Sequence, residues 1–369
     1  MKSHRPLSSL AASVAATVAL LASAGCGGGK PESPKTYAYV AVFDPQTVAS
    51  SVAQFQVRSD GLLQPLNPAT VPAGDVIVGL SVSPAGNDLI ALGYNAFLNF
   101  SINGEGKLAE NPVISPPPAL AAYPFTFTPD GRFLIVPGSL DGVSSYGVDA
   151  SGTMTLISTA AAGENPCNAA VDPSGHFAYV SSFGDHTISA YKISPSGALT
   201  PMGTAATTFD EVYLLGFSPE GFLYSSGCCQ SQSVTEYSVD PATGALTQLG
   251  IFSSASNQSS APWAFAFNPT GTYAYVGNTD ATLAGYTISS FTVDSVTGAM
   301  TRNGADTPTV GALVVAVDPS GRFLFALSQS GTIWQFKIGS TGTLVPNGTA
   351  TLPGNVRVAT SGAITFVQR

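Results

Sequence analysis

The sequence predicts an all-β fold, a seven-bladed β-propeller whose blades are four-stranded antiparallel sheets. One stretch of the length of a propeller blade, Glu164–Gly203, combines four strand patterns with two tight turns. The same pattern recurs along the chain at a nearly fixed period, which is typical of propeller blades. The composition agrees, because 44% hydrophobic and 9% charged residues, with 39 Gly and 27 Pro, suit a turn-rich β protein.

Each element of the unit follows from its residues. The short apolar run Cys167–Val171 precedes Pro173 and Gly175, which favour a tight turn. The aromatic and β-branched run up to Phe183 predicts a second strand. The alternating stretch Ile188–Ile193 has the period of a half-buried strand, and a second Pro-Gly turn leads to a short fourth strand.

Counting the two turns gives the number of blades. The Gly of the second turn recurs seven times, at Gly61, Gly106, Gly152, Gly197, Gly244, Gly298 and Gly342. The Pro of the first turn recurs six times, at Pro84, Pro129, Pro173, Pro219, Pro269 and Pro319. We interpret Thr360–Gly362 as an eroded seventh copy. The C-terminal stretch Val356–Thr360 should therefore pair beside Tyr37–Phe43 and close the ring, which removes free sheet edges.

The blades can be assigned in chain order from these turns. The predicted ranges are Tyr37–Val71, Val76–Ile114, Tyr123–Thr159, Glu164–Gly203, Asp210–Phe252, Trp263–Thr307 and Gly311–Thr351. An insertion near Thr282–Ser289 explains the wider spacing in the sixth blade. A generic β-sandwich is the alternative, but sandwiches do not repeat at a fixed period.

The N-terminus reads as a targeting segment. Lys2 and Arg5 precede an uncharged stretch rich in Ala, Leu and Val, as in a signal peptide covering residues 1–25. Ser23–Cys26 resembles the bacterial lipobox, whose Cys becomes acylated, so we expect lipidation at Cys26 and a flexible tether over residues 26–36. The expected location is a bacterial cell envelope, lipid-anchored and facing the periplasm or exterior; plain secretion is the alternative.

Charge limits the possible partners. The formal net charge is −9, and loss of Lys2 and Arg5 with the leader makes it −11. An acidic protein binds nucleic acid or an anionic membrane surface poorly, because the like charges repel. We therefore expect membrane contact through the lipid only, a monomer, and a small neutral or sugar-like ligand or a protein partner.

Three cysteines remain after acylation of Cys26. An oxidising compartment permits one disulfide among Cys167, Cys228 and Cys229. A bridge from Cys167 to the adjacent pair is one hypothesis, because both should lie on the same face of neighbouring blades. A bond between Cys228 and Cys229 is the other. Their spacing fits no common zinc site.

The loops opposite the Gly turns are the expected binding face, which we call the top. They carry nine carboxylates and no Lys or Arg: Asp44, Asp75, Asp141, Glu164, Asp185, Asp210, Glu211, Asp280 and Asp306. This favours a cation or a neutral polar ligand over a phosphorylated one. We expect no cofactor, although carboxylates from different blades could bind Ca²⁺ at the channel mouth. The alternative is that they only keep the loops soluble.

A second set of positions lies six residues before each first-turn Pro, at the expected mouth of the channel. These positions hold Val78, Tyr123, Cys167, Tyr213, Trp263 and Leu313. The aromatic ones could stack a sugar or another flat ligand, or could pack the narrowing core. We assign Tyr123, Tyr213, Trp263, Cys167 and its neighbour Asn168 as ligand-binding residues.

Candidate acid–base residues are few. His186 and Asp185 share a predicted top loop, and Glu211 stands in another, so these three are the catalytic candidates. His176 follows a tight turn where sister repeats have Arg, which indicates a surface residue. The sequence shows no serine-nucleophile motif, phosphate-binding Gly loop or spaced metal-ligand triad.

The unit DPSGHFAYV…TISAYKISPSGALT resembles the repeat of the lactonase-type seven-bladed propellers, which include 6-phosphogluconolactonase and carboxymuconate cyclase. NPTGTYAYVGNT is also similar to the propeller repeats of microbial surface proteins. The resemblance covers Tyr37 to the C-terminus. It implies a propeller and hydrolysis of a lactone.

Several positions depart from that family's pattern. Its first His position holds Cys167, and its Arg-His pair is replaced by Trp263 and Ala264. Its Asp-Leu-Gly run reads Ser182–Gly184, with His186 at the second Asp. The groups that would hold a phosphosugar are missing, so two functions follow: hydrolysis of an uncharged sugar lactone or related ester, or non-catalytic binding of a glycan, peptide or protein through the top face.

Overall fold

The computed structural model describes residues 34–47, 49–115, 125–138, 142–150, 152–208, 211–227, 233–254, 260–280, 286–309, 312–328, 330–353, 357–358 and 364–369. All regular elements in these residues are β-strands, β1 to β30. Within the described residues no helix has the length and hydropathy needed to cross a membrane.

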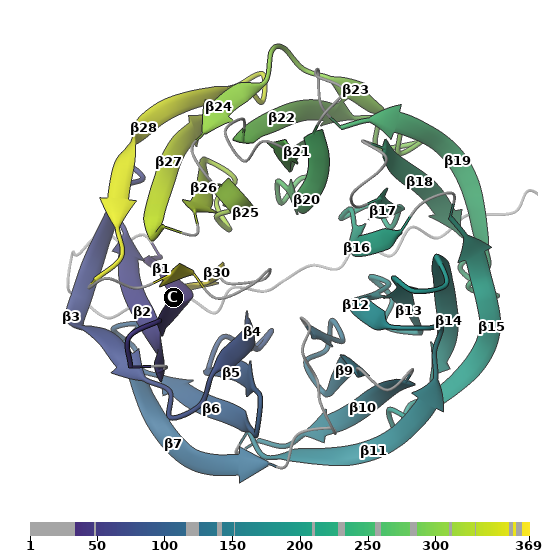
Figure 1. Cartoon of the computed structure of the whole chain (residues 1–369), viewed down its shortest axis with the longest axis horizontal. Helices are drawn as coiled ribbons and strands as arrows, with labels where there is room; N and C mark the ends of the chain where they lie inside the picture. The colour runs from purple at the N-terminus through teal and green to yellow at the C-terminus, as the bar shows by residue number, and fades with distance from the viewer. Residues whose placement is uncertain are drawn as a thin grey trace, which may run out of the picture. The chain divides into compact units, whose positions relative to one another are not determined.

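The strands form seven separate antiparallel sheets, as the sequence predicted, and Figure 1 shows them arranged around a central axis. The first blade contains β29 (Arg357–Val358), β30 (Ile364–Gln368), β1 (Thr36–Asp44), β2 (Ala49–Val57) and β3 (Leu63–Pro72). The second contains β4 (Ile77–Val82), β5 (Asp88–Gly93), β6 (Phe97–Ile102) and β7 (Leu108–Ser115). The third contains β8 (Thr126–Phe127), β9 (Phe133–Gly138), β10 (Gly142–Val148) and β11 (Met154–Ala161).

The remaining blades have the same order from the axis outward. Blade four contains β12 (Pro166–Val171), β13 (Phe177–Ser182), β14 (Thr187–Ile193) and β15 (Leu199–Thr207). Blade five contains β16 (Val212–Phe217), β17 (Leu223–Gly227), β18 (Ser233–Val239) and β19 (Leu246–Ser253). Blade six contains β20 (Ser260–Phe267), β21 (Tyr273–Asp280), β22 (Tyr286–Val293), and an outer strand divided into β23 (Met300–Arg302) and β24 (Thr307–Thr309). Blade seven contains β25 (Ala312–Val317), β26 (Phe323–Ser328), β27 (Thr332–Ile338) and β28 (Leu344–Thr351).

The C-terminal residues close the first blade, as the sequence predicted, but most of the pairing strand lies beyond the predicted segment. Arg357 and Val358 do pair with Phe43 and Val42. Most of the pairing, however, comes from β30, which runs antiparallel to Thr36–Val40. The predicted turn at Thr360–Gly362 falls between β29 and β30 in the sequence and lies outside the described residues. Where other blades have a first turn, Lys35 and Arg369 exchange two backbone hydrogen bonds.

Neighbouring blades are joined at the second-turn glycines. Gly244 has a φ of 69°, which favours glycine, and a Cβ there would lie 2.4 Å from the Phe177 ring of the preceding blade. A buried tyrosine hydroxyl on the preceding blade donates to the glycine carbonyl, in the pairs Tyr39–Gly106, Tyr179–Gly244, Tyr224–Gly298 and Tyr275–Gly342. The repeated glycines are thus required by both backbone conformation and packing.

The hydrophobic core is distributed between adjacent blades. One cluster joins blades seven and one through Phe55, Phe323 and Phe325, and another joins blades one and two through Tyr39 and Phe100. Both kinds of Gly turn lie on one face, since Pro129, Ser174 and Pro195 line the same surface cavity. The loops after each second strand therefore form the opposite face.

Candidate functional site

The predicted mouth positions share one backbone feature that the sequence did not reveal. In every blade with a described pairing there, the first strand carries a one-residue β-bulge at that position. The bulged residues are Val78, Cys167, Tyr213, Trp263 and Leu313. A bulge re-aims a side chain and ends regular pairing, and bulges are common next to functional sites. The ring of equivalent positions is therefore built into the scaffold.

Two of the predicted aromatic residues do form a cluster. The half-buried rings of Tyr213 and Trp263 lie 5.3 Å apart between centroids, tilted by 56°. Phe183, at the end of β13, meets Tyr213 edge-on at 6.4 Å. Tyr213 and Trp263 lie on the first strands of blades five and six, and Phe183 follows the second strand of blade four. The three rings form an aromatic wall across these blades. Edge-on and tilted ring contacts are favourable, and a half-buried ring in such a group still offers a surface to a flat ligand.

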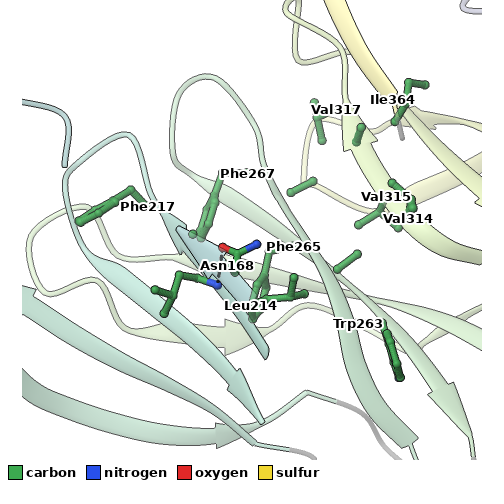
Figure 2. Close-up of a pocket in the computed structure, with 15 residues that line it drawn as sticks. Asn168, Leu214, Phe217, Trp263, Phe265, Phe267, Val314, Val315, Val317 and Ile364 are labelled. Atoms are coloured by element: carbon green, nitrogen blue, oxygen red, sulfur yellow. Dashed lines mark hydrogen bonds between the residues drawn. The ribbon is translucent and has the colours of Figure 1, made fainter. Parts of the chain in front are cut away.

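Trp263 also borders a cavity of about 440 Å³ along the innermost strands, drawn in Figure 2. Apart from the Asn168 amide and the indole N–H of Trp263, its lining side chains are apolar, and the residues are Asn168, Leu214, Leu215, Gly216, Phe217, Trp263, Ala264, Phe265, Ala266, Phe267, Val314, Val315, Ala316, Val317 and Ile364. No described lining residue is titratable. A pocket of this size suits a small molecule, and its walls favour an uncharged one.

Asn168 supplies the amide in this apolar lining. Its Oδ1 accepts a hydrogen bond of 3.3 Å from the backbone N–H of Leu215, which fixes the orientation of the amide. The nitrogen Nδ2 then points away from that bond and into the cavity (Figure 2). This donor can bind a carbonyl or hydroxyl oxygen of a ligand.

Cys167, in contrast, does not face the cavity. Its side chain is 2% exposed, and Sγ lies 3.3 Å from both the carbonyl oxygen of Val212 and Oγ of Ser181. Burial raises the pKa of the thiol to about 11. Cys167 is a free thiol in the structure, and its postulated partners Cys228 and Cys229 lie outside the described residues, so the disulfide stays a prediction.

The three catalytic candidates lie at the top face but outside the cavity lining. Asp185 and His186 occupy the turn between β13 and β14, where Asp185 Oδ1 accepts from Thr187 Oγ1 at 2.8 Å. His186 has a left-handed φ of 57°, and its carbonyl accepts from the N–H of Thr208 at 2.8 Å. Glu211 directly precedes β16 and is half-buried. The turn is connected to the aromatic wall because Phe183 begins it.

Several top carboxylates are engaged by their own loops. Asp75 accepts hydrogen bonds from the backbone of Val76 and Asn95. Asp44 accepts from the N–H of Gln46 and from a threonine hydroxyl, and these bonds lower the pKa of its carboxyl. Asp306 was expected in a top loop, but it bonds Arg302 along the outer strand of blade six.

Metal binding gains no support from these groups. Among the described residues, no group of three or more His, Cys, Asp or Glu side chains could hold a metal ion. Ca²⁺ at the channel mouth therefore stays a prediction. Tyr123 and Cys26, predicted for ligand binding and lipidation, lie outside the described residues.

The sequence reasoning missed the channel walls. Phe265 and Phe267 alternate along β20, a period that puts them on one face, and both line the cavity. That pattern could have indicated an aromatic channel wall. Phe183 gave no such signal, because its contact with Tyr213 depends on how blade four meets blade five.

The seven antiparallel sheets arranged around one axis define this protein as a seven-bladed β-propeller. The model of the family described as "Lactonase, 7-bladed beta-propeller" matches residues 32–317, and the chain belongs to that family. A search of curated proteins found no match.

Solved structures agree on the fold. The periplasmic gluconolactonase of Pseudomonas aeruginosa is 16% identical with a TM-score of 0.71, covering 90% of this chain and 99% of that one. A Lactobacillus plantarum protein is 18% identical with a TM-score of 0.70 and the same coverage. A candidate 6-phosphogluconolactonase from Bacteroides uniformis is 18% identical with a TM-score of 0.69, again covering 90% and 99%.

Proposed function

We propose that this protein hydrolyses an uncharged sugar lactone, or a related ester, outside the cytoplasm. The supporting observation is the chemistry of the channel opening. It combines the Tyr213–Trp263 wall with the Asn168 amide, and no charged side chain is among the described lining residues. The family supplies the reaction class, and the similar P. aeruginosa protein is called a gluconolactonase.

In this proposal the lactone ring stacks against Trp263, and its carbonyl oxygen accepts a hydrogen bond from Asn168 Nδ2. That bond polarises the carbonyl and stabilises the negative charge that develops on its oxygen. His186, or Asp185 beside it, takes a proton from water as the water oxygen bonds to the acyl carbon. The ring C–O bond then breaks, and the ring oxygen leaves as a hydroxyl after receiving a proton.

The missing cations set the specificity. A phosphorylated lactone would need Arg, Lys or a helix N-terminus to hold its phosphate. The positions where the related pattern has His and Arg hold Cys167 and Trp263. Cys167 turns its thiol toward backbone carbonyls. We therefore expect discrimination in favour of neutral lactones.

The proposed location is the cell envelope, with a monomer tethered through acylated Cys26. The support is the N-terminal pattern of Lys2, Arg5 and the uncharged stretch that follows. Metabolic labelling with a radioactive fatty acid tests this assignment. Label in the wild type but not in Cys26→Ala is expected, and unlabelled wild type would contradict it.

Purified protein should open glucono-δ-lactone faster than the spontaneous rate and should leave its 6-phosphate derivative near background. Trp263→Ala is expected to raise KM, and His186→Ala to lower kcat by about 10²-fold or more. His176→Ala is the matched control, because His176 lies on the opposite face and should change neither. Parallel assays with Ca²⁺ and with EDTA test metal dependence. Turnover of no neutral lactone above background would overturn hydrolysis.

Ligand binding without catalysis is the second candidate, and the cavity lining favours it. None of the described lining residues can act as an acid or base. Under this function, calorimetry would show saturable binding of a neutral sugar or glycan without turnover. Trp263→Ala should weaken that binding, whereas His186→Ala should not affect it.

A further inference from the structure

A second cavity, separate from the channel, opens between blades four and five. Its volume is about 430 Å³, and it shares no lining residue with the channel cavity. Its lining residues come from β15 and the residue after it in blade four, and from β16, β17, β18 and β19 of blade five, strands that Figure 1 labels. The lining residues are Thr207, Thr208, Val212, Ser225, Gly227, Ser233, Thr235, Tyr237, Gln248 and Ile251.

The chemistry of this crevice differs from that of the channel. Most of its lining side chains end in a hydroxyl or amide, and none of the described ones carries a charge. Ser225 and Thr235 are directly paired across β17 and β18, and Tyr237 is two residues further along β18. Burial raises the pKa of Tyr237, and hydrogen bonds from Ser225 and Thr235 offset part of that rise. The three hydroxyls therefore converge.

Comparison between blades shows that Ser225 is unusual. It lies in the middle of β17, the second strand, and pairs with Leu215, two residues after the bulged Tyr213. The six equivalent residues are all apolar: Val40, Ala91, Val136, Val180, Val276 and Ala326. Ser225 is only 2% exposed, so its hydroxyl stands where the repeat otherwise packs a hydrocarbon. Burial of such a group is unfavourable unless it is hydrogen-bonded.

The equivalent position between blades three and four is closed by a hydrogen bond. Between blades three and four, the Tyr191 hydroxyl donates to the carbonyl of Ala161 at 2.6 Å. Tyr237 and Thr207 occupy the equivalent positions between blades four and five, where both line the open crevice. A hydrogen bond thus bridges blades three and four directly, whereas blades four and five leave a space lined by hydroxyl groups.

We propose that this crevice binds a neutral polyhydroxylated molecule of monosaccharide size. Its volume lies in the range of small-molecule pockets. Hydroxyl and amide side chains can both donate to and accept from sugar hydroxyls, whereas an anionic ligand would find no cation among the described lining residues. The site is independent of the lactone site proposed for the channel.

The proposal is tested by calorimetry or saturation-transfer NMR with D-glucose, D-galactose and myo-inositol, using D-gluconate and D-glucose 6-phosphate as charged counterparts. At least one neutral probe should bind saturably and more tightly than the charged ones. Ser225→Val introduces the residue found in sister blades and should weaken binding about fivefold to tenfold. Thr235→Val, which is nearly isosteric, should have a similar effect.

Two controls keep the result interpretable. Ser189→Ala alters the position equivalent to Thr235 in blade four and should leave binding unchanged, and Trp263→Ala should also leave it unchanged because the channel is a separate site. Thermal melts verify that each variant is folded. The proposal is overturned if no neutral probe binds, if Ser225→Val and Thr235→Val bind like wild type, or if Trp263→Ala alone abolishes binding.

Discussion

Glu236 is a buried carboxyl at a repeat position that holds an amide in blades one, two and seven, as Gln54, Asn99 and Gln335. Its side chain is 4% exposed, and Oε1 has no hydrogen-bond partner among the described residues. The equivalent Gln54 and Gln335 each accept the backbone N–H that begins the outer strand of the next blade, at 2.9 and 2.7 Å. Glu236 instead has Oε1 close to Gly298, where an added Cβ would lie 2.4 Å away.

The surroundings of Glu236 disfavour its charged form. Burial raises the pKa of this carboxyl. Burial also raises the pKa of Tyr224, whose hydroxyl donates to the carbonyl of Gly298, and the negative charge of Glu236 adds to that rise. Glu220 is the other carboxylate that acts on Tyr224. A carboxyl with a raised folded-state pKa binds its proton more tightly when folded. Stability therefore falls as pH rises from about 4.5, the usual value, through the folded-state pKa.

Glu236→Gln should remove this loss. A buried unsatisfied polar group costs about 1–3 kcal/mol, and at neutral pH the substitution should recover most of it. For a chain of this length that corresponds to a rise in Tm of roughly 1–4 °C at pH 8, and to almost none at pH 4. Differential scanning calorimetry across this pH range gives the measurement.

The converse substitution provides a matched control. Gln335→Glu places a carboxyl at the same repeat position in blade seven, and its Tm should fall at pH 8 relative to pH 4. An equal Tm difference between Glu236→Gln and wild type at both pH values would refute the electrostatic reasoning. A Gln variant less stable than wild type at pH 8 would refute it also.

Further predictions concern the scaffold and the channel. Gly244→Ala should destabilise by about 2–4 kcal/mol in urea unfolding, through backbone strain and the Phe177 ring contact, whereas Gly203→Ala, with nothing within 4 Å of its Cβ, should lose only the strain component. If both cost the same, the ring contact is unimportant. In a variant lacking the other thiols, native Cys167 should react with a disulfide reagent at pH 8 at least about 100-fold more slowly than in urea, because its pKa is raised from 9.0 to about 11. Equal rates would contradict its burial.

The sequence was sufficient for the blade count because each turn glycine has a local cause. Gly244 needs both a left-handed φ and an open space over Phe177, so substitution is restricted wherever the repeat occurs. The closing strand was assigned less well. Its pairing with β1 resumes at Ile364. No turn residue marks that point, because Lys35 and Arg369 pair where the other blades have a first turn. Long-range pairing of this kind leaves little local signal.

The candidate site was predicted in part for the same reason. Equivalent spacing correctly brought Tyr213 and Trp263 together, because a repeat position has one place in every blade. The direction of each side chain was not predictable in this way. Cys167 has the same spacing, yet its thiol turns toward Val212, since a bulge frees the residue from strict alternation and local packing then decides.

The position of a bulged residue is thus fixed by the repeat, whereas the direction of its side chain is not, and this difference affects how the chemistry of the site can change within the family. The bulge fixes the place at which a side chain leaves the first strand. The regular pairing on both sides of Tyr213 and Trp263 holds the bulge in place whichever residue occupies it. A residue of different chemistry in place of Trp263 should therefore leave the pairing of β20 with β21 intact, and we expect it to alter the ligand that the channel accepts. The same argument applies to Ser225, whose hydroxyl lines the crevice while β17 keeps regular pairing with β18. Function in this propeller should accordingly vary at a few equivalent positions, while the turn glycines and the rings beneath them stay constant.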